Sequence, residues 1–217
     1  MPTRSRETPA WRLPTALIVL SLVPVVAGVS RLTKVATAEL GEGNARFAAS
    51  PVPIVLHIVG AVAFCVLGAF QFPQRIRRTH PRWHRLAGRA LIPCGLIAAL
   101  TGVWMTLYYP HPVGDGPLLL GFRLVFGTAM AVALTLGYLT VRRRDFRAHR
   151  AWMIRGYAIG QGAGTQVLTG LPWAIAFGQP DELTRALLLG ASWVVNIAVA
   201  EWVIRRSPRP AARPVLG

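Results

Sequence analysis

Residues 53–72 read PIVLHIVGAVAFCVLGAFQF, and this stretch decides the class of fold. It contains no Asp, Glu, Lys or Arg, and its single histidine is His57. A helix of about 20 residues is long enough to cross the hydrocarbon core of a bilayer. The stretch does not alternate apolar and polar residues as barrel strands do, so it predicts a transmembrane helix.

Five further apolar runs extend the same pattern along the chain. They cover roughly residues 13–32, 90–109, 118–141, 156–178 and 185–204. Only 15% of the 217 residues are charged, whereas soluble domains carry about 25%. The sequence therefore predicts an all-α integral membrane bundle of six transmembrane helices, forming one domain over residues 13–204. Residues 1–12 form a tail before it, and the proline-rich residues 205–217 predict a disordered tail after it.

The charges predict how the bundle is oriented. Most of the 24 basic residues lie in residues 1–12, 73–89, 142–155 and 205–217, which share one side if six helices cross in order. Acidic residues gather on the other side, at Glu39, Glu42, Asp115, Asp181 and Glu182. The positive-inside rule then places both termini in the cytoplasm, which indicates a bacterial inner membrane. Apolar runs separate the basic clusters, so we expect anionic lipid headgroups as partners and no nucleic acid.

The first apolar run has two interpretations. It is a cleaved signal peptide or an uncleaved first helix, and its length exceeds the usual core of about 7–15 residues. We therefore expect an uncleaved helix, followed within residues 33–50 by a short surface helix. Cys65 and Cys94 lie inside apolar runs, so we expect them to be packing residues and not a disulfide.

Two short junctions repeat the dipeptide His-Arg at the start of a helix. They read HRLAGR at residues 84–89 and HRAWMIR at residues 149–155, and both lie on the predicted cytoplasmic side. His84 and His149 would stand at the same depth, and two neutral imidazoles suit the axial positions of a b-type haem. Four arginines would clamp its propionates: Arg85, Arg89, Arg150 and Arg155. A quinone carbonyl or a lipid phosphate fits the same groups, and simple anchoring to headgroups is the alternative.

His57 lies well inside its predicted span. An ionisable residue there is a candidate functional residue, and residues at helical spacing from it form a stripe that ends at Gln71 and Arg75. His57 and Gln71 would then line an internal polar path. The alternative is that His57 forms a hydrogen bond with a neighbouring helix and only holds the two together.

Small and charged residues mark three further contacts. Gly156, Gly160 and Gly164 recur every fourth residue, which indicates close helix packing or a flat cofactor against the glycine face. We expect Arg123 to extend outward or to pair with an outer acid such as Asp115. We expect Glu201 to pair with Arg89 or Arg155.

Three strings carry a family resemblance. HIVGAVAFCVLGAFQF, HRLAGRAL and RDFRAHRAWMIRGYA together resemble the bacterial DUF2306 family of predicted multi-pass membrane proteins over roughly residues 50–205. The resemblance implies the topology and a set of characteristic positions: His57, Gln71, Arg75, His84, Arg85, Gly88, Arg89, Asp145, His149, Arg150 and Arg155. The chain is also similar in architecture to cytochrome b561-type proteins, whose histidine pairs ligate b-type haem. The fourth helix offers no histidine to pair with His57, so this similarity implies one haem site at most.

Two functions follow as expectations. The first is a haem- or quinone-associated redox component, with His84 and His149 as ligands of the haem iron. The second is a non-enzymatic membrane protein that binds or moves a lipid or small solute through His57, Gln161 and Thr165. The sequence shows no convincing Ser/His/Asp set, phosphate loop or carboxylate cluster, so nothing indicates a hydrolase.

Overall fold

The computed structural model describes residues 11–39, 41 and 45–206, and within this part the chain is helical and contains no strand. The predicted tails fall largely outside the described residues. In chain order the elements are α1 (Arg12–Ala36), α2 (Ala45–Ala49), α3 (Pro51–Gly68), η2 (Ala69–Gln71), α4 (Gln74–Thr79), α5 (Pro81–Tyr108), α6 (Pro117–Arg142), α7 (Phe146–Gly160), α8 (Gly162–Phe177) and α9 (Glu182–Arg205).

Five helical segments are long and apolar enough to cross a membrane. They are α1, α3 continued by η2, α5, α6 and α9, and each covers one of the predicted runs. The main difference is α5, which begins at Pro81, well before the predicted residue 90. Proline at the first helical position has a φ angle that already suits a helix. The last part of the basic connection, residues 81–89, therefore forms additional turns at the start of α5. The protein therefore has several membrane-spanning helices.

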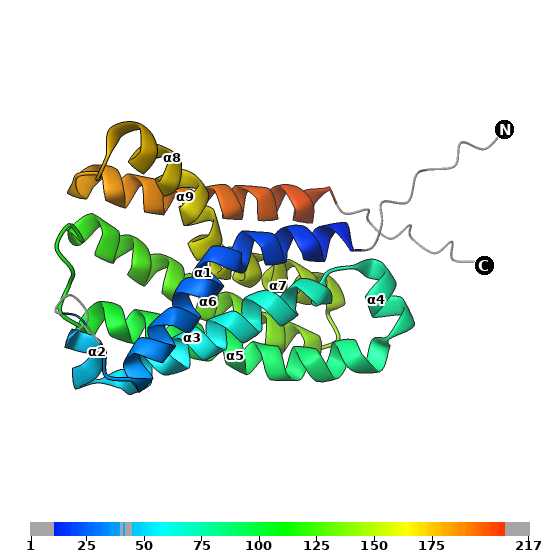
Figure 1. Ribbon diagram of the computed structural model, residues 1–217. Helices are drawn as coiled ribbons and strands as arrows, with labels where there is room; N and C mark the ends of the chain where they lie inside the picture. Colours follow the sequence, from blue (N-terminus) through cyan, green and yellow to red (C-terminus); the bar gives the residue numbers. More distant parts are fainter. Residues whose placement is uncertain (1–10, 40, 42–44, 207–217) are drawn as a thin grey trace, which may run out of the picture.

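Four helices form the centre of the bundle. Helix α3 packs against α5, α5 against α6, α6 against α7, and α7 against α3, so α5 and α7 lie diagonally opposite one another. The core between them is a cluster of buried side chains that includes Phe64, Met130, Leu134 and Tyr157. Helix α1 packs on α3 and α8, and α9 packs on α6, α7 and α8. In Figure 1, α1 runs obliquely across the bundle and α9 lies along its upper side.

The bundle has two distinct ends. The start of α1, the end of α9 and the short helix α4 lie at one end, whereas α2 and the connection between α8 and α9 lie at the other (Figure 1). We call these the α4 end and the α2 end. The described chain therefore starts and finishes at the same end of the bundle.

The predicted span at residues 156–178 is wrong as a single helix. The chain instead forms α7 and α8, which meet at Gln161. Helix α7 begins at Phe146, where the Asp145 carboxylate accepts a hydrogen bond of 2.9 Å from the Ala148 amide. Glycines at 160, 162 and 164 weaken the helix around the break, since each costs about 1 kcal/mol relative to alanine. Neither piece alone meets the length of a membrane span.

The short helix expected within residues 33–50 is α2. Its position is as predicted, but Phe47 is buried at 3% exposure, packed with Ile54, Ile58 and Tyr109. Arg31 and Arg46 lie over the Phe47 ring at 5.0 and 4.7 Å from its centroid. This helix therefore packs onto the α2 end of the bundle through the buried Phe47 ring, which also contacts two arginine cations.

Candidate functional site

The two His-Arg junctions converge at the α4 end of the bundle. His84 lies in the first turn of α5 and His149 in the first turn of α7, on the two diagonally opposed helices. Besides burial, the neighbouring groups that act electrostatically on the His84 ring are Arg77, His149 and Arg85. The two imidazoles that the sequence placed at equal depth are therefore within electrostatic range of one another.

The His149 ring is fixed by a backbone contact. Its Nδ1 lies 2.7 Å from the backbone oxygen of Gly137 in α6. A carbonyl oxygen only accepts, so Nδ1 carries the proton and Nε2 carries the lone pair. Histidines that bind metals usually donate their second ring N–H to a carbonyl or carboxylate in this way. The contact therefore fixes the tautomer of the His149 ring.

Two buried polar atoms in the described part of the chain lack hydrogen-bond partners, and both lie at this end. They are His84 Nδ1 and Gln71 Nε2. The Gln71 side-chain oxygen lies 3.8 Å from where a Cβ on Gly88 would stand, and Gly88 follows His84 by one helical turn. The Gln71 side chain therefore lies against the face of α5 that carries His84. A buried polar atom left unpaired costs about 1–3 kcal/mol, so these two atoms are unusual within the described part of the chain.

The surroundings of the histidines carry excess positive charge. Burial, together with nearby Arg150 and Arg78, holds the pKa of Arg77 below its ordinary value. Arg77 lies in α4 and Arg150 in α7, so two like charges from different elements lie near one another at this end of the bundle. Arg77 was not among the predicted clamps, because its basic connection gave no sign of which arginine would face inward.

The predicted arginine clamps divide into two groups. Arg155 is not directed to the histidines, because its guanidinium donates to Glu201 at 2.6 and 3.1 Å and lies 4.8 Å from the Trp152 ring. This confirms one of the two pairings predicted for Glu201. Arg85 and Arg89 are both exposed, and of these two Arg85 acts electrostatically on His84. Arg77 and Arg85 therefore lie near His84, and Arg150 lies near Arg77.

His57 lies apart from this site, between α3 and α5. Its Nδ1 is 2.8 Å from the Ala98 backbone oxygen and 3.4 Å from the Thr101 hydroxyl. This is the geometry of a hydrogen bond that holds two helices together. About 21 Å of helix separates His57 from Gln71, and Phe64, packed in the core at 2% exposure, lies between them. The described side chains of α3 therefore form no continuous polar path from His57 to Gln71.

A buried polar network surrounds the break between α7 and α8. Gln161 accepts a hydrogen bond from Ser21 at 2.9 Å and donates to Tyr157 at 2.7 Å, and Tyr157 donates to the Cys65 backbone oxygen at 2.6 Å. These contacts join α1, α7 and α3. Irregular backbone at membrane depth requires such partners for its freed polar groups. The sequence interpretation named Gln161 but missed Ser21 and Tyr157, since polar residues inside an apolar run do not reveal which helices they join.

The glycine face of the same segment packs against protein. A Cβ would approach Leu134 to 2.8 Å from Gly156, Phe64 to 3.0 Å from Gly160, and the Leu20 backbone oxygen from Gly164. Close packing, the first of the two interpretations of this face, is confirmed.

A second group of ion pairs lies at the α2 end of the bundle. The Asp115 carboxylate, whose side chain is fully buried, accepts from Arg123 at 2.6 Å and from Arg185 at 3.0 Å. The predicted pairing of Arg123 is confirmed. Arg185 was not predicted, because it comes from α9 and the contact depends on how α6 and α9 pack. This cluster joins α9 to the loop before α6.

Among the residues described, no group of three or more His, Cys, Asp or Glu side chains is placed to hold a metal ion. A haem with two axial histidines needs only a pair of side chains.

Comparison with known proteins identifies a family. Residues 54–204, more than half of the chain, match the model of a family described as "Predicted membrane protein (DUF2306)". No curated protein and no solved structure matches the chain. The matched segment contains α5 and α7 with both His-Arg junctions. The chain belongs to the DUF2306 family of predicted membrane proteins.

Proposed function

We propose that this DUF2306 protein is a b-type haem-binding redox component of the bacterial inner membrane. Its six crossings would be α1, α3, α5, α6, the broken pair α7–α8, and α9. The basic α4 end would face the cytoplasm, as the positive-inside rule requires. Broken helices occur at membrane depth where other helices satisfy the freed backbone groups, and the network around Gln161 provides these partners.

The observation that carries this proposal is the meeting of His84 and His149 from diagonal helices. Cofactor sites of helix bundles are built from side chains that face one another across the core. His149 has its Nε2 lone pair available, because Nδ1 donates to Gly137. His84 has a buried ring nitrogen without a partner. Two such imidazoles match the ligand requirement of a b-type haem.

The remaining groups fit the carboxylates of a haem. Arg77 and Arg150 supply fixed positive charge, and the unpaired Gln71 Nε2 is a donor that needs an oxygen. Charge-assisted bonds from arginine to carboxylate are among the strongest hydrogen bonds in proteins. A bound haem would supply one-electron chemistry. The protein's part would be to orient the two rings, hold the carboxylates and exclude water.

An absorption spectrum tests the proposal directly. The full-length protein, purified in detergent after expression with added haem, is expected to show Soret and alpha bands that sharpen on reduction with dithionite. Replacement of His84 or His149 by Ala should abolish these bands, whereas His80→Ala and His111→Ala should retain them. A flat spectrum, or bands that persist in both His84→Ala and His149→Ala, would overturn the proposal.

The Gln71 amide also favours a second candidate, a non-enzymatic protein that holds an anionic lipid or solute. An unpaired donor at the same end of the bundle as two arginines suits a phosphate oxygen as well as a haem carboxylate. In that case no haem band would be found, and His84→Gln would be tolerated. Binding to vesicles of phosphatidylglycerol, reduced by Arg77→Gln and unchanged by Arg143→Gln, would support this candidate.

A further inference from the structure

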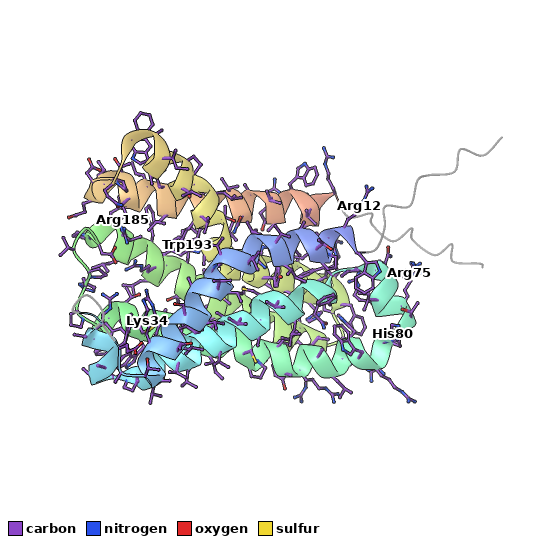
Figure 2. The ribbon with its side chains drawn as sticks, viewed as in Figure 1. Arg12, Lys34, Arg75, His80, Arg185 and Trp193 are labelled. Carbon is purple, nitrogen blue, oxygen red and sulfur yellow. The ribbon has the colours of Figure 1, made fainter. Side chains whose placement is uncertain are left out.

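A groove lies beside the histidine site, at the same end of the bundle. It has a volume of about 610 Å³ and lies between the start of α1, η2, α4 and the start of α5. Figure 2 labels two of its residues, Arg75 and His80, at this end, and Lys34 and Arg185 at the opposite end. Ligand sites usually have volumes of about 300–1,000 Å³, so the groove has room for a small head group.

The lining combines flat aromatic rings with a few donors. Its aromatic residues are Trp11, Phe70 and Trp83, and its main polar residues are Arg75, Thr79 and His80. The Trp11 and Phe70 rings meet edge to face with centroids 6.2 Å apart. Trp11 is 63% exposed and Trp83 is 40% exposed, so ring surface is left open. Aromatic walls with convergent donors suit a flat ligand that carries carbonyl oxygens.

The groove and the histidine site share a wall made of neighbouring residues. Phe70, Ile76 and Trp83 line the groove. The next residue after each of them belongs to the histidine site: Gln71, Arg77 and His84. The same short elements, η2, α4 and the start of α5, thus contribute residues to both. A ligand in the groove would lie at the same end of the bundle as any cofactor held by His84.

The charge of the lining separates two classes of membrane ligand. Among the described residues that line the groove, Arg75 is the one Arg or Lys. A phosphodiester headgroup is better served by several fixed cations, whereas a neutral ring with carbonyl oxygens needs stacking surface and one or two donors. Tryptophans at the membrane interface place the groove at headgroup level, from which an attached hydrocarbon tail can enter the bilayer.

We propose that this groove binds the head group of a membrane quinone. Trp11 and Trp83 stack on the ring, and Arg75 and His80 donate to its carbonyl oxygens. This site would hold a lipid-soluble partner at the same end of the bundle as the cofactor. That role rests on the function proposed above. Binding of the quinone itself does not require haem.

The test is a calorimetric titration of the detergent-purified, full-length protein with decylubiquinone. Loss of a stacking ring in Trp83→Leu is expected to raise the Kd about tenfold. Arg75→Gln should raise the Kd by a similar factor and serves as the second test if Trp83→Leu folds poorly. Two matched controls should leave the Kd unchanged: Arg78→Gln, which is not among the residues that line the groove, and Trp104→Leu, towards the opposite end of α5.

Three results would overturn this proposal: no binding, binding that neither Trp83→Leu nor Arg75→Gln weakens, or displacement of the quinone by phosphatidylglycerol, which would make the groove a phospholipid site. The two proposals fail separately. Quinone binding without a haem spectrum would remove the haem proposal alone, and a haem spectrum without quinone binding would remove the groove proposal alone.

Discussion

The side-chain amide of Asn196 in α9 donates to the backbone oxygen of Ala158 in α7 over 3.0 Å. The same side chain accepts a hydrogen bond of 2.9 Å from Thr165 in α8 through its oxygen. One residue of α9 therefore binds both pieces of the broken helix. Because the break leaves backbone groups without their usual helical partners, Asn196 stabilises an arrangement that the local sequence alone would not hold.

Replacement of Asn196 by Leu should destabilise the bundle. Polar contacts between membrane helices contribute about 1 kcal/mol each, and Asn196→Leu removes two while leaving Ala158 O unpaired. We expect a lower unfolding midpoint in detergent, followed by far-ultraviolet circular dichroism. The control is Thr135→Val in α6, whose hydroxyl donates to Ala131 in its own helix and is exposed. An equal loss in both variants would contradict the role of Asn196.

Two glycines of α8 make a matched pair. A Cβ on Gly164 would collide with the backbone of Leu20 in α1, whereas nothing lies within 4 Å of one on Gly170. Gly164→Ala must push α1 away, and overpacking of this kind costs about 1–3 kcal/mol. Gly170→Ala should be neutral or stabilise α8 by up to about 1 kcal/mol. Thermal unfolding of the two variants in detergent checks this, and a Gly164→Ala variant as stable as Gly170→Ala would show that α1 does not pack there.

The membrane spans could be predicted because each depends on its own residues. Residues 53–72 form α3 and η2 almost as predicted, since an uninterrupted apolar run of this length has few alternatives to a helix. The break at Gln161 could not be predicted in the same way. It depends on Ser21 and Asn196, which come from the far ends of the chain and become neighbours only in the folded bundle.

The candidate site was predictable only in part. His84 and His149 were singled out because the His-Arg dipeptide repeats at two helix starts of equal depth. Arg77, which acts electrostatically on His84, was not singled out, and Arg155 pairs with Glu201. The direction in which an arginine points depends on partners such as Glu201, and helical spacing alone does not specify them.

Arg155 and Glu201 offer a charge-reversal test. Their side chains are about one quarter exposed, at 28% and 29%, and form two parallel hydrogen bonds. Either Arg155→Glu or Glu201→Arg places like charges together, and we expect a loss of about 1 kcal/mol, the upper range for a partly exposed pair. The double variant should recover most of the loss. Unfolding midpoints of all four proteins give the coupling, and a double variant less stable than both singles would contradict the pairing.

Cysteine labelling tests the orientation of the bundle. Val113 lies in the loop between α5 and α6 at the α2 end and is fully exposed, and Arg143 follows α6 at the α4 end. In a background that carries Cys65→Ala and Cys94→Ala, an impermeant maleimide added to intact cells should label Val113→Cys. Arg143→Cys should be labelled only after permeabilisation, because the arginine-rich end stays in the cytoplasm. The reverse pattern would place the histidine site on the outer face, where the anionic lipids of the inner leaflet could not reach its arginines.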